Sequence, residues 1–267
     1  MSVLPDLLAV APGATADSWV GSAGGPVGKR AFGGLLMAQS LAAASRTVDD
    51  PDKRPTAMHL QYLRGAEAGA ATDYAVTRVY DGRTAAARRV EAFQAGRMLT
   101  VASVSFSAEL VGPSHGETYS VPGDPETLAR TGPPGPAPAV PLDELDIRIV
   151  DDRSSGEFVR RMWWRATVPM PPEQLPHMMI ATYVTDLYGI DPALQVHGHS
   201  MQARSHRSGT TDFSIWFHHP IRADQWNLLE SRSPAAGRGR GVITSSLVAV
   251  DGTLVATLVQ EGLVADR

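Results

Sequence analysis

Residues 33–46 read GGLLMAQSLAAASR, a run in which small and apolar side chains predominate. Leu35, Leu36, Gln39 and Ala42 recur at the spacing of one helix face, so the run predicts a buried helix. An extended piece precedes the helix at 17–20, and strand-like runs follow at 57–64, 74–80, 86–94 and 98–106. The first half of the chain is therefore predicted to place a group of strands around one helix.

The same order of elements returns in the second half. An extended run, a helix and four strands are predicted there in turn, at 158–168, 177–189, 211–218, 226–231, 242–250 and 254–264. Residues 61–64 (QYLR) correspond to residues 216–219 (WFHH) at an offset of about 155 residues. We interpret the halves as a duplication that packs into one pseudo-symmetric unit. The predicted fold class is α+β, with two tandem antiparallel sheets that each wrap around a helix.

A proline-rich stretch separates the halves. Residues 132–141 read GPPGPAPAVP, and proline removes hydrogen-bond donors and biases its neighbours toward extended backbone. We predict an N-terminal domain over residues 1–115, a Pro-rich linker over 116–150 and a C-terminal domain over 151–267.

Composition narrows the classes of function. The 267 residues are 43% apolar and 19% charged, which is typical of a globular protein with a core. A net charge of −4 without a basic block argues against nucleic acid and anionic membranes as partners. No apolar run approaches the roughly 18 residues of a membrane span, and the N-terminus lacks signal-peptide features. We expect a cytoplasmic protein without membrane insertion.

The sequence contains no cysteine, which excludes thiol catalysis, Cys-ligated zinc, iron–sulfur clusters and disulfides. His197, His199 and His206 have no carboxylate that completes a ligand set, so no metal site is expected. A G-x-S-x-G nucleophile motif is also missing. If the protein is a hydrolase, water is the most economical nucleophile.

Short motifs throughout the chain resemble the acyl-CoA thioesterase II family, whose members have a double hotdog fold. The resemblance rests on FGG at 32–34, MHLQYLRG at 58–65, ARRV at 87–90, YVTDL at 183–187, ALQVHG at 193–198, DFSIWFH at 212–218 and VATLVQEG at 255–262. Together with residues 17–20, these motifs are distributed over nearly the whole chain and follow the same order as in the family. The resemblance implies hydrolysis of acyl-CoA to fatty acid and CoA without a cofactor, by an Asp, a Thr and a Gln in the C-terminal hotdog.

Carried over by motif, the resemblance implies that Asp186, Thr210 and Gln260 are the catalytic residues. Thr210 and Thr211 stand in tandem, and a slip of one residue would turn the other hydroxyl toward the site. Taken alone, Asp186 at the edge of an apolar helix face is either a general base with a raised pKa or a partly exposed helix-end carboxylate. Gln260 ends an apolar strand row and is either a site amide or a strand end in solvent.

Substrate-binding candidates lie mainly in the first half. Gly33 and Gly34 begin a helix. Either the free N–H groups there stabilise an oxyanion, or the two glycines, which lack side chains, allow close packing of the helix on the sheet. His59 is a further candidate, and Arg88 is a candidate for the CoA phosphates, with a solvated surface as its alternative. Gln39 is expected to occupy the place in the first helix that Asp186 has in the second.

Two other functions stay open at this level. One is a non-catalytic acyl-CoA-binding protein, and the other is a hotdog enoyl-CoA hydratase, although its D-x-N-P-x-H motif is not present. The edges of such sheets have unpaired backbone groups that a neighbouring copy of the chain can cover. We therefore predict a homo-oligomer.

Overall fold

A computed structural model describes residues 3–119, 121–131, 143–153, 157–203 and 205–266. Its helices are α1 Val3–Leu8, α2 Gly33–Ser45, α3 Gln174–Thr185 and α4 Asp191–Gln195, with 3₁₀ turns η1 Pro125–Thr127 and η2 Met201–Ala203. The strands of the first half are β1 Val10–Pro12, β2 Ser18–Gly21, β3 Arg54–Tyr62, β4 Thr72–Asp81, β5 Ala85–Gln94 and β6 Arg97–Ser107. Those of the second half are β7 Leu145–Asp152, β8 Val159–Ala166, β9 His206–Phe217, β10 Asn227–Gly237, β11 Arg240–Ala249 and β12 Leu254–Asp266.

The strands that the structure describes form one antiparallel sheet of twelve, in the order β1-β2-β4-β5-β6-β3-β9-β12-β11-β10-β8-β7. The α+β double hotdog fold is confirmed, but the two predicted sheets are joined edge to edge by the β3–β9 pairing. At the centre of that pairing His59 lies opposite Ser214, and these residues are 155 positions apart. This is the offset of the sequence repeat, so a pseudo-twofold axis passes through the β3–β9 seam.

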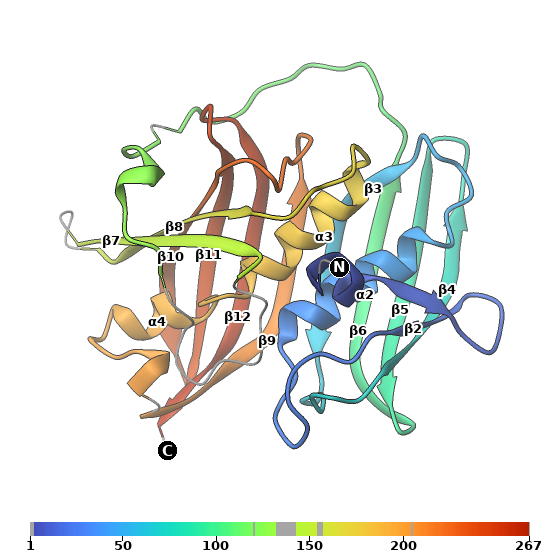
Figure 1. Cartoon of the computed structure of the whole chain (residues 1–267), viewed down its shortest axis with the longest axis horizontal. Coiled ribbons are helices and arrows are strands. Elements are labelled where there is room, and N and C mark those ends of the chain that lie inside the picture. Colours follow the sequence, from blue (N-terminus) through green and yellow to red (C-terminus); the bar gives the residue numbers. More distant parts are fainter. Residues whose placement is uncertain (1–2, 120, 132–142, 154–156, 204, 267) are drawn as a thin grey trace.

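Helices α2 and α3 lie side by side near the middle of the sheet (Figure 1). Helix α2 is buried on nearly all sides, because it combines Leu and Met with small Ala side chains that let neighbours approach. Its Met37 and Leu41 share one continuous core with Met58 and Leu60 of β3 and with α3. The two halves therefore bury one common core. No helix of the described residues has the length and apolar character needed to cross a membrane.

Two predicted boundaries differ from the structure. Residues 145–150, which were assigned to the linker, belong to β7 and pair with β8, while the proline-rich stretch 132–141 lies outside the described residues. The helix predicted over 177–189 spans Gln174–Thr185, and the positive φ of 59° at Tyr188 excludes its continuation to residue 189. Asp186 therefore lies at the end of α3 rather than inside it.

The outer edges of the joined sheet are β1 and β7. Strand β1 is three residues long and ends at Pro12, which lacks a donor for a further strand. The predicted homo-oligomer stays a prediction, and the fusion of the two halves already pairs the inner edges β3 and β9 within one chain.

Candidate active site

Asp186 links the end of α3 to the start of α2. Its Oδ1 accepts a hydrogen bond from the Thr210 hydroxyl at 3.1 Å, and the Gly34 backbone N–H also bonds to the carboxylate. Phe32, the N-cap residue of α2, supplies no side-chain cap, so the carboxylate of α3 takes that place. A Cβ on Gly33 would lie 2.7 Å from Asp186 Oδ2, and therefore only glycine permits this approach.

The pKa of Asp186 is displaced upward. Burial raises it to about 7, while the hydrogen bonds from Thr210 and Gly34 lower it by a smaller amount. The residue as a whole is partly exposed. Asp186 is thus a carboxylate that is able to gain or lose a proton near neutral pH.

Thr210 reaches Asp186 because β9 contains a β-bulge. Thr210 lies opposite Gly262 and Asp212 lies opposite Glu261, so Thr211 is an extra residue without a partner on β12. Phe213 and Ile215 point into the core, and in a regular strand Thr211 would share their side of the sheet. The bulge reverses this order and turns the Thr210 side chain inward. The ambiguity between the tandem threonines is resolved in favour of Thr210.

Gln260 lies on β12, on the same side of the sheet, two residues from the Gly262 that faces Thr210. Its side chain is 3% exposed, and its Nε2 has no hydrogen-bond partner among the described residues. Its Oε1 lies against Gly189, where an added Cβ would come within 2.4 Å. Leaving a buried amide donor unpaired costs roughly 1–3 kcal/mol, and this donor is available to a ligand or a bound water.

Tyr62 also belongs to this site, although the sequence analysis did not single it out. Its hydroxyl donates to the Gly33 carbonyl oxygen at 2.8 Å. Burial and the negative charge of Asp186 raise the pKa of Tyr62 well above its usual value. Strand alternation with Met58 and Leu60 was the available signal, because it places Tyr62 on the core face of β3.

Gly34 brings the two helices into close contact, which predicts that Gly34→Ala is destabilising. A Cβ there would lie 2.4 Å from the backbone oxygen of Tyr183, which has little freedom to move. The expected loss is about 1–2 kcal/mol, since the better helix propensity of alanine offsets only part of the strain. Urea denaturation measures it, with Gly237→Ala as the control because nothing lies within 4 Å of its added Cβ. Equal stabilities of the two variants would contradict the close packing.

His59 does not lie beside Asp186, and its predicted contact with a substrate finds no support in the geometry of this site. Met58 and Leu60 point into the core, and His59 therefore points to the opposite face of β3. There its Nδ1 contacts the Ser214 hydroxyl at 2.9 Å, and its ring meets Trp216 edge to face. The imidazole stabilises the β3–β9 seam rather than a ligand near Asp186.

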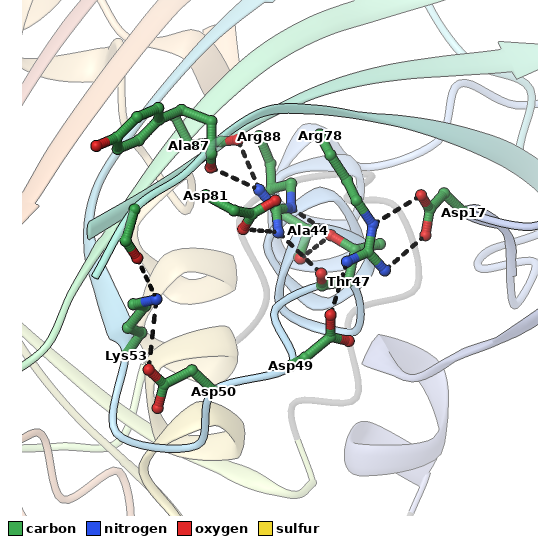
Figure 2. Close-up of polar contacts among 12 residues, drawn as sticks. Asp17, Ala44, Thr47, Asp49, Asp50, Lys53, Arg78, Asp81, Ala87 and Arg88 are labelled. Atoms are coloured by element: carbon green, nitrogen blue, oxygen red, sulfur yellow. Dashed lines mark hydrogen bonds and ion pairs between the residues drawn. The ribbon is translucent and has the colours of Figure 1, made fainter. Parts of the chain in front are cut away.

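Arg88 is likewise not available for CoA phosphates. Its side chain is fully buried at the far end of α2 from Gly33, and its guanidinium bonds to protein groups (Figure 2). The acceptors are Thr47 Oγ1 and O, Tyr80 O, Ala87 O and Asp81 Oδ1. The arginine ties the end of α2 to the β4–β5 hairpin.

Arg88→Met is expected to lower the free energy of unfolding by about 2–3 kcal/mol, because buried carbonyl acceptors lose their donors while the half-exposed Asp81 is rehydrated. The KM for acyl-CoA should not change. Arg89→Met is the matched control and should cost little, since Arg89 is exposed and its ion pair in the described part of the chain is with Glu91. A raised KM for Arg88→Met alone would restore the predicted substrate contact.

Gln39 is not the counterpart of Asp186. It lies within α2, whereas Asp186 follows the last residue of α3. Its Nε2 donates to the carbonyl oxygens of Leu7 and Ser22, and its Oε1 accepts from the Tyr74 hydroxyl. All of these contacts are internal, so Gln39 fixes the N-terminal segment on α2.

The histidines of the second half do not form a metal site in the described residues. The rings of His199 and His206 lie 4.4 Å apart, and His206 Nε2 is 3.2 Å from Asp266. In the part of the chain that the structure describes, no three His, Asp or Glu side chains are grouped as metal ligands. Contacts join Asp186 to Thr210, Gly33 and Gly34 and join Tyr62 to Gly33, while Gln260 lies on the same face of the sheet, against Gly189.

Known proteins match the chain along both halves. The family model for the acyl-CoA thioesterase N-terminal domain matches residues 20–107, and the one for the C-terminal domain matches residues 121–264. Human acyl-coenzyme A thioesterase 8 is 29% identical over 88% of this chain and 81% of its own length. Acyl-CoA thioesterase 2 of Haemophilus influenzae is 26% identical over 88% of each chain. The crystal structure of acyl-CoA thioesterase II TesB2 from Mycobacterium marinum has a TM-score of 0.84 at 28% identity, covering 100% of this chain and 98% of that one. The chain belongs to the acyl-CoA thioesterase family.

Proposed function

We propose that this protein hydrolyses acyl-CoA thioesters to a free fatty acid and CoA at the site formed by Asp186, Thr210 and Gln260. The observation that carries the proposal is a carboxylate with a pKa of about 7 that accepts the Thr210 hydroxyl, on the face of the sheet where Gln260 presents a buried amide donor without a protein partner among the described residues. The activities named for its relatives support the same reaction class.

In the proposed mechanism a water molecule donates one hydrogen bond to Asp186. Thr210 and the Gln260 Nε2 hold the same water, and Asp186 takes its proton as the oxygen attacks the thioester carbon. The α2 first-turn amide at Gly33 donates to the developing oxyanion. The tetrahedral intermediate then expels CoA thiolate, the carbon–sulfur bond breaks, and the proton held by Asp186 returns to solvent or to the thiolate. No acyl-enzyme forms.

The two alternative functions make different demands on this site. A hotdog hydratase of the considered type needs an Asp and His in a D-x-N-P-x-H motif, and residues 186–189 read DLYG instead. A pure binding protein has no use for a titratable Asp beside an unpaired amide. The geometry at Asp186 therefore favours hydrolysis over both alternatives.

The proposal predicts a specific pH dependence. Asp186 must be ionised to accept a proton, and burial raises its pKa to about 7, so kcat/KM should fall about tenfold for each pH unit below 7 and level off above it. A continuous thiol-reagent or ultraviolet assay of acyl-CoA cleavage between pH 5 and 9 measures the profile. A rate that stays constant down to pH 5 would remove Asp186 from the role of base.

A further inference from the structure

The side chain of Thr211 fastens the β9 bulge to the neighbouring strands. Its hydroxyl lies 3.2 Å from the Glu261 backbone oxygen and 3.3 Å from Glu261 Oε1, both on β12. It also accepts a hydrogen bond of 2.9 Å from Arg240 Nη1 on β11, and the same nitrogen contacts Glu261 Oε1 at 2.9 Å. Thr211 thus ties the extra residue of β9 to two other strands.

The first half contains a bulge of the same construction. On β3, Pro55 lies opposite Phe106 and Ala57 lies opposite Ser105, so Thr56 is the extra residue. The Thr56 hydroxyl donates to the Ser105 backbone oxygen at 3.3 Å. Thr56 and Thr211 are 155 positions apart, which is the offset that relates His59 to Ser214 across the seam.

The surroundings of the two bulges differ in chemistry. Pro55, Val104 and Arg46 occupy the first-half positions that correspond to the three site residues of the second half. None of the three side chains offers a hydroxyl, an amide or a carboxylate. The first half therefore keeps the bulge without a second site, and Thr56 is a natural internal reference for what a bulge threonine contributes to folding alone.

We propose that Thr211 is a positioning residue, whose hydrogen bonds hold the β9 bulge so that the neighbouring hydroxyl of Thr210 stays directed at Asp186. This inference rests on the proposed hydrolysis. Without the bulge, regular alternation would turn Thr210 outward and leave Asp186 without its hydroxyl partner. Small displacements of groups at a reacting centre are sufficient to reduce a rate about a hundredfold.

The test compares Thr211→Val with Thr211→Ser and with Thr56→Val in the full-length enzyme. Thr211→Val keeps the shape but removes the hydroxyl, and kcat for a good acyl-CoA substrate should fall about ten- to hundredfold, with KM within about twofold. Thr211→Ser restores the hydroxyl and should keep at least about half of the wild-type kcat. Thr56→Val should keep the wild-type kcat, and it should lose less thermal stability than Thr211→Val because the Thr56 hydroxyl makes a single hydrogen bond in the described part of the chain.

The pH dependence of kcat/KM distinguishes a positioning role from a general loss of stability, because a loss of stability alone would not change it. The Thr210 hydrogen bond lowers the pKa of Asp186, so loosening it should shift the acidic limb of kcat/KM to higher pH in Thr211→Val. The ionisable side chains that interact with Asp186 are Tyr62 from β3 and Tyr183 from α3, and burial raises the pKa of both tyrosines. Neither titrates in the range of that limb.

The outcomes separate this inference from the proposed function. If wild type hydrolyses acyl-CoA but Thr211→Val matches Thr56→Val in kcat and in its acidic limb, the positioning role is wrong and the hydrolysis stands. If wild type releases no thiol from any acyl-CoA, the proposed function and this inference are overturned together. A slow Thr211→Val with a displaced limb, rescued by Thr211→Ser, supports the role.

Discussion

Replacing Asp186 by Asn is expected to lower kcat/KM for acyl-CoA hydrolysis by about 10²–10⁴-fold at pH 8, the usual contribution of a positioned general base. The amide keeps the size of the side chain, and its single carbonyl oxygen still accepts a hydrogen bond in the place of Asp186 Oδ1, but it does not take a proton from water. Initial rates of thiol release at saturating and limiting substrate measure both kinetic constants.

Stability provides the control for this variant. The pKa of Asp186 is about 7 in the folded chain and near 3.8 when unfolded, so folding favours the protonated form. This contribution to stability is complete below pH 3.8 and is lost as the pH rises through 7. An asparagine side chain does not ionise, and the Asp186→Asn variant should therefore melt at or above the temperature of wild type at pH 8. An unfolded Asp186→Asn variant, or one with wild-type turnover, would contradict the assignment.

Gln260→Leu is expected to reduce kcat by about 10²–10³-fold, comparable to the loss of one oxyanion-hole donor. The Gln260 Nε2 is the buried donor that faces the proposed water without a partner among the described residues. Its loss should cost the fold little, because leucine removes an unpaired polar group from an apolar row that contains Ala256 and Leu258. Steady-state kinetics and urea denaturation together measure the two effects.

Gln94→Leu is the matched control in the first half. Gln94 is also buried, but its Nε2 donates to the carbonyl oxygens of Glu67 and Ala70 and to Thr72, and its Oε1 accepts from the Glu67 N–H. Its replacement should destabilise the fold and leave kcat unchanged. If Gln260→Leu instead loses stability while it keeps its turnover, Gln260 is a structural amide.

Local patterns account for the elements that the sequence predicts well. The apolar and small residues of 33–46 predict a buried helix without knowledge of its packing partner. In the same way, the alternation of buried and exposed residues predicts β5 and β6 without knowledge of the other strands of the sheet. The joining of the two sheets depends on edges that are far apart in sequence. Nothing within β3 or β9 indicates that each would take the other as its neighbour.

The site was only partly predictable for a similar reason. The resemblance supplied Asp186, Thr210 and Gln260. In the structure a β-bulge turns the Thr210 side chain toward Asp186, whereas regular strand alternation would have predicted the opposite face for it. Arg88 was predicted to contact the CoA phosphates or solvent, although its neighbours in alternation, Ala86 and Val90, are buried. The positive charge of an arginine favours an exposed position, whereas the periodicity of β5 places Arg88 in the core, where protein oxygens accept from its guanidinium.

The most direct test is the release of products from a panel of acyl-CoA thioesters of increasing chain length, with wild type and Asp186→Asn in parallel. The account predicts free thiol and fatty acid in equal amounts from wild type, and almost none from Asp186→Asn. Binding without thiol release would identify an acyl-CoA-binding protein. Loss of crotonyl-CoA absorbance without free thiol would identify a hydratase, and either result would contradict hydrolysis at this site.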